Sequence, residues 1–461
     1  MATLDPRIFR SYDIRGKAHE QVSAQACLLI GKAFGSTLRE MYKKQHPTVV
    51  VGRDARTHGP ELEQALIEGL KTTGCHVLTI DQTPSPVNYF TICTQKCDGG
   101  VQITASHNPK EDNGLKLQIR DAQAYSGNDL QKLLKRIERE EFLTGKGSIK
   151  HFDACTPYKK YLSKMFQNMG KNLHVAIDGG NGVAGPLYVE VLKSIGCTVT
   201  EIFTEPDGTF PNHAADPSKW DTLRDLQKAV KKTRADIGLA FDGDGDRIGI
   251  VDEKGIIRTA DEILLLLAKD HLSRNPGKPV VFTVSNSSSL ETEIQTWGGI
   301  PVMCTVGHSF VEHTMRQHGA LLGGEQSGHF FFGEDYFGFD DALMASLRTL
   351  SILQKRGLPF SALFEEFPKV YQTPEYRPTC RDEDKARIVE EIKQHFLDKK
   401  YPMNPLDGAR IDFGEGAWAG IRKSNTAPRL SVCMEARSPE KLKEVEREVM
   451  GVLKMYSEIS W

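Results

Sequence analysis

Three aspartates at alternate positions are the strongest chemical signal in the sequence. Asp242, Asp244 and Asp246 are separated by single glycines and followed by Arg247. Glycine permits a tight backbone path and Asp is too short to splay away, so the three carboxylates can surround one hard cation. A plain acidic turn would not need the third carboxylate, so the pattern favours a cation site.

A helix–loop–helix calcium site is the alternative interpretation, because Glu253 is the twelfth residue counted from Asp242. That loop requires glycine at its sixth position, where Arg247 stands, and it requires a helix on each side. Strand-like segments flank the aspartates instead, at 236–240 and 248–251. The sequence therefore predicts a cation-binding turn between two strands.

A serine in a stiffened loop is the second candidate. Ser106 follows the apolar run 100–103, and Pro109 restricts the loop after it. A hydroxyl at the end of a strand can act as a nucleophile or carry a phosphate. Lys116 comes one strand later, where its ammonium could neutralise a transferring phosphate or shuttle a proton. Taken singly, the serine loop could also be a simple turn and the lysine a solvated side chain.

A glycine-bracketed loop offers groups for a sugar. Glu325, Ser327 and His329 lie between glycines, and His308 precedes them in the chain. Carboxylates accept hydrogen bonds from neighbouring sugar hydroxyls, so this loop is suited to a carbohydrate. A structural role for His329 is the alternative.

The loop at 422–428 offers donors for a phosphate. It combines Arg422, Ser424, Asn425 and Thr426 with no carboxylate. Such a set matches a dianionic phosphate, although an ordinary polar hairpin is also consistent with it.

Three repeated segments are expected to position these loops. Each has an apolar strand, a loop rich in Gly or Ser, an amphipathic helix and a second strand, starting at Thr48, His174 and Pro279. Strand–helix–strand units favour sheets covered by helices, so we expect three α/β domains. Helices at 382–399 and 439–455 and strands at 409–413 and 430–436 then fit a smaller α+β domain. The expected domains are 1–152, 153–254, 255–368 and 369–461.

The composition excludes several classes of protein. The 461 residues carry 59 basic and 61 acidic side chains, so a net charge of −2 favours neither nucleic acid nor an anionic membrane. No apolar run of about 18 residues and no secretory signal is apparent, which predicts a soluble, cytoplasmic protein. The nine cysteines are expected to be reduced, and the close pair Cys93 and Cys97 has no partners for a zinc site.

Motifs along nearly the whole chain resemble those of the α-D-phosphohexomutase family, most closely its phosphomannomutase/phosphoglucomutase branch. They lie at 9–16, 52–56, 104–109, 178–182, 242–247, 324–329 and 422–428. The resemblance implies four domains around a central cleft, with the first three alike, which agrees with the threefold repeat.

The resemblance also implies a role for each candidate residue. Ser106 would be phosphorylated and would bind one Mg²⁺ per chain together with Asp242, Asp244 and Asp246. The groups around the transferring phosphoryl would be Lys116, Arg15, Arg247 and His329. The substrate would be bound by Tyr12, His308, Glu325, Ser327, Arg422, Ser424, Asn425 and Thr426.

The implied reaction is a reversible isomerisation of mannose or glucose phosphates between the 1- and 6-positions, with a hexose 1,6-bisphosphate as intermediate and activator. A phosphoglucosamine mutase is an alternative, because Gln326 is common among those enzymes, whereas Asn425 favours the mannose/glucose branch. A sugar phosphatase and a non-catalytic sugar-phosphate sensor are further alternatives. The expected partner is a hexose phosphate, with no nucleic acid or membrane, and the expected state is a monomer or weak homodimer.

Overall fold

The computed structural model describes residues 4–424 and 427–461, which form two compact units. The first unit runs to Asp270 and also includes Ser327–Glu365. The second unit comprises His271–Gln326 and Glu366–Trp461.

The first sheet of the first unit is mixed, with six strands in the order β1-β5-β4-β2-β3-β6. β2 is parallel to β3 and β4, whereas β5 is antiparallel to β4 and β1. The central strands β2 and β4 are buried and apolar, as expected for strands covered by helices on both faces. The strands are β1 (Ile14–Lys17), β2 (Thr48–Arg53), β3 (His76–Gln82), β4 (Gly99–Ile103), β5 (Asp112–Ile119) and β6 (Ser148–His151).

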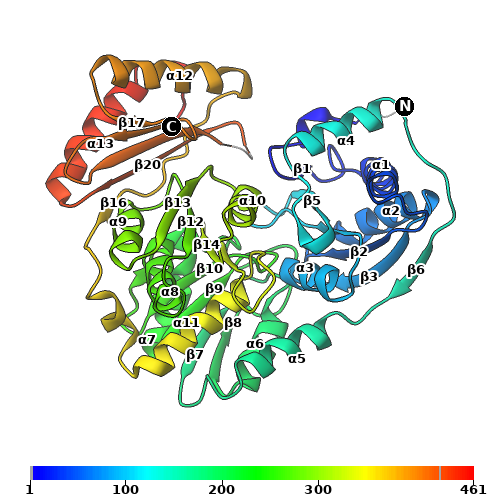
Figure 1. The fold of residues 1–461 in the computed structure, drawn as a ribbon, viewed down its shortest axis with the longest axis horizontal. Helices are drawn as coiled ribbons and strands as arrows, with labels where there is room; N and C mark the ends of the chain where they lie inside the picture. Colours follow the sequence, from blue (N-terminus) through cyan, green and yellow to red (C-terminus); the bar gives the residue numbers. More distant parts are fainter. Residues whose placement is uncertain (1–3, 425–426) are drawn as a thin grey trace. The chain divides into compact units, whose positions relative to one another are not determined.

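Two helices cross closely beside this sheet (Figure 1). A Cβ on Gly31 of α1 would lie 2.4 Å from the Leu66 carbonyl oxygen of α2, and one on Gly69 would lie 2.3 Å from that of Leu28. Glycine is therefore required on both helices where their backbones meet. The two crossing helices are α1 (Ala24–Tyr42) and α2 (Gly59–Thr72). The other helices of this part of the chain are α3 (Ser85–Thr94) and α4 (Asn128–Glu138).

The second sheet of this unit has five strands in the order β11-β10-β9-β7-β8. β7 is parallel to β8 and β9, and β9 is antiparallel to β10, with Phe241 opposite Ile248. The three aspartates thus occupy the turn of a hairpin, which confirms the flanking strands and excludes the helix–loop–helix alternative. The elements are β7 (His174–Asp178), β8 (Thr198–Ile202), β9 (Ile237–Phe241), β10 (Ile248–Asp252), β11 (Ile257–Arg258), α5 (Cys155–Met165), α6 (Gly185–Ser194), α7 (Arg224–Thr233) and α8 (Ala260–Arg274).

The first unit ends with β15 (Phe330–Phe332) and α11 (Ala342–Arg356). Phe331 pairs with Asp340, so the intervening segment folds back on β15. The Asp341 side chain caps α11 by accepting from the backbone N–H of Met344.

The second unit contains a parallel sheet in which β12 pairs with both β13 and β14. The elements are β12 (Pro279–Thr283), β13 (Ile300–Cys304), β14 (Leu322–Gly324), α9 (Ser288–Thr296) and α10 (His308–His318).

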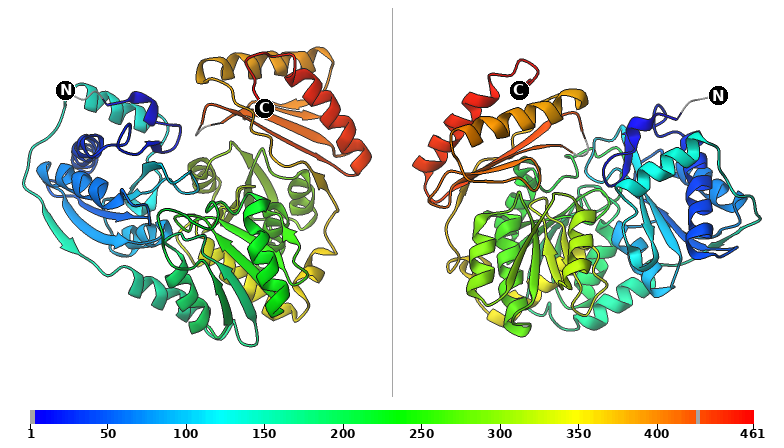
Figure 2. Two further views of the ribbon diagram at one scale, coloured as in Figure 1. Left: turned by 180° about the vertical axis from the view of Figure 1, so that it is seen from behind. Right: turned by 45° about the horizontal axis from the view of Figure 1, so that its top comes forward.

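The last sheet is antiparallel, in the order β16-β20-β19-β18-β17, and two helices cover one of its faces (Figure 2). Its elements are β16 (Tyr371–Gln372), β17 (Met403–Asn404), β18 (Ala409–Asp412), β19 (Trp418–Lys423), β20 (Leu430–Ala436), α12 (Asp382–Asp398) and α13 (Pro439–Leu453). The predicted fold class, three α/β domains followed by a smaller α+β domain, is confirmed.

Short 3₁₀ helices complete the described chain at Pro6–Ile8, Arg120–Ala122, Trp220–Leu223 and Phe360–Phe364. Among the described helices, none has both the length and the apolar character needed to cross a membrane. All nine cysteines are free thiols, in agreement with the expectation of reduced residues.

Candidate active site

Ser106 is a fully buried residue whose backbone lies in the left-handed region, at φ 50°. A residue with a Cβ adopts this region at a cost of about 1 kcal/mol or more, so the surrounding structure must impose it. The Ser106 hydroxyl donates a hydrogen bond of 2.6 Å to Oδ2 of Asp242. The predicted carrier serine and the predicted cation loop are thus in direct contact, although they lie far apart in the sequence.

Thr104 and Asp54 hold the start of the serine loop. The Thr104 hydroxyl accepts from the Ser106 backbone N–H at 2.8 Å and donates to Oδ2 of Asp54 at 2.7 Å. The same Asp54 oxygen accepts from Nε of Arg56 at 3.1 Å. Burial raises the pKa of Asp54, and Arg56 acts against that rise.

The buried guanidinium of Arg56 holds the rest of the loop. It donates hydrogen bonds of 2.6 to 2.9 Å to four backbone carbonyl oxygens, those of Ser106, Asn108, Pro109 and Asp112. A planar guanidinium with five fixed donors can bind several carbonyls at once, which an ammonium cannot. Arg56, which follows the end of β2 beside β4, therefore sets the conformation of the serine loop.

The aspartate loop is organised around Asp242. Its Oδ1 accepts from the backbone N–H groups of Gly245, Asp246 and Arg247 at 3.0 to 3.2 Å. Gly245 has φ 77°, which favours glycine. A Cβ on Gly243 would lie 2.5 Å from the Ser106 carbonyl oxygen, so glycine is needed where the two loops meet.

The three carboxylates fit a hard cation. Asp242, Asp244 and Asp246 are completely buried, and one oxygen from each lies within 4.8 Å of the others. Among the described residues, Oδ1 of Asp244 and Oδ1 of Asp246 accept no hydrogen bond. A buried carboxylate oxygen loses its hydration and needs a hydrogen bond, a counter-charge or a metal ion in its place. An all-oxygen ligand set is the type that Mg²⁺ prefers. Burial, together with repulsion from the carboxylates of Asp246 and Asp244, raises the pKa of Asp242 well above its usual value.

Lys116 bridges two of these carboxylates. Its ammonium lies 2.6 Å from Oδ2 of Asp244 and also bonds Oδ2 of Asp246. Burial by itself would lower the pKa of Lys116, but the two carboxylates outweigh it and raise the pKa well above 10.5. Lys116 is therefore a permanent cation beside the acidic loop. Its position on β5, opposite Gln102 of β4, brings it back towards the loop after β4.

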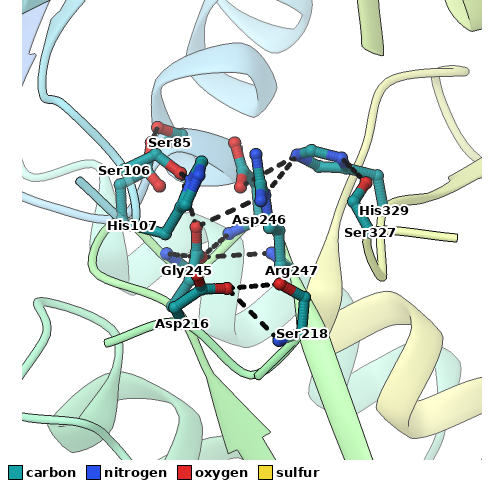
Figure 3. Close-up of polar contacts among 12 residues, drawn as sticks. Ser85, Ser106, His107, Asp216, Ser218, Gly245, Asp246, Arg247, Ser327 and His329 are labelled. Carbon is teal, nitrogen blue, oxygen red and sulfur yellow. Dashed lines mark hydrogen bonds and ion pairs between the residues drawn. The ribbon is translucent and has the colours of Figure 1, made fainter. Parts of the chain in front are cut away.

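His329 reaches the aspartate loop through its backbone. Arg247 and His329 form an antiparallel bridge, and the Ile248 N–H donates to the Gly328 carbonyl at 3.1 Å. The His329 ring faces Arg247 and Asp246 (Figure 3). Its Nε2 lies 3.2 Å from Arg247 Nε and 3.4 Å from Asp246 Oδ1, while Nδ1 lies 3.0 Å from the Ser327 hydroxyl.

Arg15 approaches the serine loop from β1. It donates to the Ala105 carbonyl at 3.0 Å and to the Asn108 side chain at 3.3 Å, and it pairs with Asp13. Burial opposes its charge, but Asp13, Tyr12 and Asp244 raise the pKa of Arg15 above its usual value. Tyr12, a predicted substrate residue, is thus an electrostatic neighbour of Arg15.

Four predicted residues lie in the second unit within the described part of the chain. His308 is the first residue of α10, and the Gly307 N–H before it donates to the buried Glu325 side chain at 2.8 Å. Arg422 is the penultimate residue of β19, with Nη2 3.8 Å from Oε1 of Glu375. Ser424 follows, while Asn425 and Thr426 lie outside the described residues.

Lys385 of α12 holds this last loop. Its ammonium donates to the carbonyl oxygens of Ser424 and Ala427 at 2.9 and 3.0 Å. The side chain is mostly buried, so the two bonds are shielded from water.

Several residues around the site were not predicted from the sequence. Ser85 donates to Oδ2 of Asp244 at 2.6 Å, and its N–H bonds the Asp244 carbonyl at 2.8 Å. The His107 ring lies 3.2 Å from the Ser106 hydroxyl. Asp216 is buried, and although burial raises its pKa, His107 and Arg247 bring the pKa below the usual value. The Pro84-Ser85-Pro86 sequence could have indicated the start of a helix. No local feature indicated that Ser85 would bond Asp244.

Four family models match consecutive parts of the chain. Three describe the alpha/beta/alpha domains I, II and III of phosphoglucomutase/phosphomannomutase and match residues 6–144, 151–255 and 259–371. The fourth describes the C-terminal domain of the same proteins and matches residues 375–452.

Full-length relatives carry related names. A phosphomannomutase/phosphoglucomutase of Pseudomonas aeruginosa is 39% identical over 452 residues, covering 98% of this chain and 96% of the relative. A phosphoglucomutase of Neisseria gonorrhoeae is 36% identical over the whole of both chains. A crystal structure of a phosphoglucomutase/phosphomannomutase family protein from Burkholderia thailandensis has a TM-score of 0.91 and 34% identity, with both chains fully covered.

Proposed function

This chain belongs to the phosphoglucomutase/phosphomannomutase family, and from that premise we propose which of its residues carry the reaction. As a member, the chain is an enzyme, a hexose phosphate mutase. We propose that Ser106 carries the phosphoryl group between the 1- and 6-oxygens of a mannose or glucose phosphate. The main support is the 2.6 Å hydrogen bond that joins the Ser106 hydroxyl to the acidic loop.

In the proposed first step, the phosphoserine donates its group to the free hydroxyl of the substrate. The bond between phosphorus and Ser106 Oγ breaks, and a bond between phosphorus and the sugar oxygen forms. Such transfers need alignment and charge neutralisation more than covalent help. Lys116, Arg15 and Arg247, all buried cations, supply that charge.

His329 is the proposed acceptor of the substrate proton. Arg247 can only donate, so Nε2 of a neutral His329 accepts from it, and Nδ1–H donates to Ser327. Once Nε2 takes up a proton, Asp246 Oδ1 at 3.4 Å stabilises the charged ring. The His107 ring, 3.2 Å from Ser106 Oγ, is suited to return a proton to the serine when it becomes free.

Mg²⁺ is the proposed metal, one per chain, held by Asp242, Asp244 and Asp246 with Ser106. When bound, it would supply a Lewis acid beside the phosphate oxygens. The two aspartate oxygens that accept no hydrogen bond among the described residues support this assignment.

The resulting hexose 1,6-bisphosphate would then turn end over end and return its other phosphate to Ser106. This requires sugar and phosphate contacts that accept both orientations. The proposed sugar contacts are Tyr12, His308, Glu325 and Ser327. The proposed phosphate contacts are Arg422, Ser424, Asn425 and Thr426, and Lys385 bonds the carbonyl oxygens of Ser424 and Ala427.

Mannose and glucose phosphates are favoured over aminosugar phosphates. Gln326, the residue that suggested the aminosugar alternative, accepts a hydrogen bond from Cys433 Sγ at 3.5 Å. Its amide oxygen is therefore engaged by the protein. Turnover of mannose 1-phosphate, glucose 1-phosphate and glucosamine 1-phosphate, measured side by side, tests this preference.

We also propose domains at 1–152, 153–254, 255–368 and 369–461, a cytoplasmic location, and a monomer or weak homodimer. Nine free thiols support a reducing compartment. Light scattering at several concentrations measures the oligomeric state.

The central experiment replaces the carrier serine. Wild-type protein incubated with glucose 1,6-bisphosphate should gain one phosphoryl group by intact-protein mass spectrometry. Ser106→Ala should gain none and should not isomerise glucose 1-phosphate, whereas the exposed-site control Ser457→Ala should behave as wild type. Wild-type turnover in Ser106→Ala would refute the proposal, and steady phosphate release would indicate a phosphatase.

A further inference from the structure

Tyr89 is a buried residue of α3 that the proposed mechanism does not use. Only 2% of it is exposed, and its hydroxyl forms no hydrogen bond with any residue that the structure describes. Burying a hydroxyl without a partner costs about 1 to 3 kcal/mol. Phe would fill the same space without this cost, so the presence of Tyr suggests that the hydroxyl has a function.

Its place on the helix directs Tyr89 towards the acidic loop. Ser85 and Tyr89 are four residues apart on α3, so their side chains share one face. Ser85 donates to Asp244 through both its hydroxyl and its backbone N–H. The face of α3 that carries Tyr89 is thus fixed against Asp244, one of the two carboxylates that Lys116 bonds.

A ring contact connects Tyr89 to the segment that faces His329. Tyr89 and Phe339 pack edge to face, with centroids 5.5 Å apart at an interplanar angle of 68°. The next residue, Asp340, has Oδ2 3.8 Å from Nε2 of His329. Tyr89 therefore joins α3, whose Ser85 bonds Asp244, to the segment that carries Asp340.

Aromatic packing fixes the ring on this side of the site. Rings from α3, α5 and the segment before α11 contact one another with centroids 5.0 to 6.1 Å apart. The members of this cluster are Phe90, Tyr158, Tyr161, Tyr336, Phe337 and Phe339, of which Phe339 contacts Tyr89. The edge-to-face pair with Phe339 adds about 0.5 to 1.5 kcal/mol beyond burial, and Phe339 is itself held by the cluster, so Tyr89 has little freedom to turn away.

The charges acting on the hydroxyl belong to the proposed catalytic centre. Burial raises the pKa of Tyr89 well above 10, and its charged neighbours are Lys116, Asp340, Asp246 and Asp244. The hydroxyl is therefore neutral, and it can both accept and donate. The Lys116 ammonium has three N–H donors, of which Asp244 and Asp246 take two.

We propose that Tyr89 is a positioning residue for phosphoryl transfer: its hydroxyl, an acceptor for Lys116 and a donor for Asp340, couples the placement of Lys116 to that of Asp340 and His329. Hydrogen bonds at catalytic centres commonly shorten when substrate binds, so the coupling acts in the loaded enzyme. This inference rests on the proposed roles of Lys116 and His329.

The test compares Tyr89→Phe with Tyr125→Phe, which removes a buried hydroxyl from the core of the first sheet. Tyr89→Phe should lower kcat on the order of tenfold and change KM by less than about twofold, because substrate contacts are intact. Tyr125→Phe should leave both constants unchanged. A kcat for Tyr89→Phe within about twofold of wild type would overturn the proposal.

Phe339→Leu provides a second test that keeps the hydroxyl and removes the ring that orients it. It should lower kcat in the same direction, and the double variant should be no slower than Tyr89→Phe alone, since both act through one hydroxyl. If Tyr89→Phe does not fold, an unchanged kcat in Phe339→Leu overturns the proposal.

A measurement on Ser106 separates this inference from the proposed function. Wild type that gains no phosphoryl group from glucose 1,6-bisphosphate would refute the proposed function itself. Wild type that is phosphorylated at the same rate as Tyr89→Phe would refute only the role of Tyr89.

Discussion

Arg56 donates a hydrogen bond of 2.9 Å from Nη2 to the carbonyl oxygen of Ser106. This bond is one of four by which a single buried guanidinium holds the backbone of the serine loop. The proposed phosphoryl carrier is thus positioned by a residue outside the proposed reacting groups, and the left-handed backbone of Ser106 is maintained by that network.

Arg56→Lys should test this relationship. Lysine keeps the charge beside Asp54 but cannot reach four carbonyls, so we expect the unfolding free energy to fall by about 2 kcal/mol and kcat by about tenfold or more. Arg53→Lys, at a half-buried arginine paired with Glu63, is the matched control and should change kcat little. If Arg56→Lys lowers kcat no more than Arg53→Lys does, the positive charge at position 56 is sufficient and the four carbonyl bonds are not needed.

Gly243→Ala should misplace the serine relative to the cation loop. The added Cβ would lie 2.5 Å from the Ser106 carbonyl oxygen, so the loops must separate, and kcat should fall by roughly 10- to 100-fold. Gly451→Ala, in a helix with open space around the new methyl group, is the control and should keep full activity. Normal kinetics in Gly243→Ala would mean that the loops can part without consequence.

Asp244→Asn should weaken the cation site. One anionic ligand is lost, so the affinity for Mg²⁺ should fall on the order of tenfold or more. Calorimetric titration with Mg²⁺ and the Mg²⁺ dependence of turnover should shift together. Asp207→Asn, at an exposed carboxylate of the same domain, serves as the control. An unaltered Mg²⁺ titration in Asp244→Asn would rule out the proposed ligand set.

Asp341→Asn should change how stability depends on pH. Burial raises the pKa of Asp341 to about 6, although Met344, Tyr336 and Tyr158 donate to the carboxylate. The folded chain therefore holds this proton more tightly than the unfolded chain, whose pKa is about 3.8. Stability from this group is fully present below about pH 3.8 and is lost as pH rises through about 6.

The expected size follows from a shift of about two pKa units, or about 3 kcal/mol. Denaturant unfolding at several values between pH 4 and pH 7 should show wild type losing up to about 3 kcal/mol more than Asp341→Asn over this range. Other titrating groups are common to both proteins, so the difference isolates Asp341. Parallel curves for the two proteins would contradict the assigned pKa.

Arg422→Ala should act on substrate binding. Loss of a guanidinium from the proposed phosphate loop should raise KM for both the 1-phosphate and the 6-phosphate sugar on the order of tenfold, with a smaller change in kcat. Lys443→Ala, at an exposed cation of the following helix, should leave KM unchanged. An effect confined to one isomer would argue against an intermediate that binds in both orientations.

The sequence by itself determined the features that depend on neighbouring residues. The hairpin that carries Asp242, Asp244 and Asp246 was predictable, because glycine spacing and the flanking apolar strands are local signals. The repeated strand–helix–strand pattern likewise predicted the α/β domains. The Ser106 loop was identifiable as a candidate, but its chemistry by itself did not distinguish a carrier from a turn.

The tertiary structure alone decided which groups meet. Ser106 contacts Asp242 across 136 positions of sequence, and Ser85 contacts Asp244 across 159. Buried partners such as Arg56 and Tyr89 gave no sign of their roles, because a charged or aromatic residue is recognisable as a support only from what surrounds it. Strand pairing and helix packing bring these distant side chains together, and burial then makes each hydrogen bond and charge strong enough to fix the site.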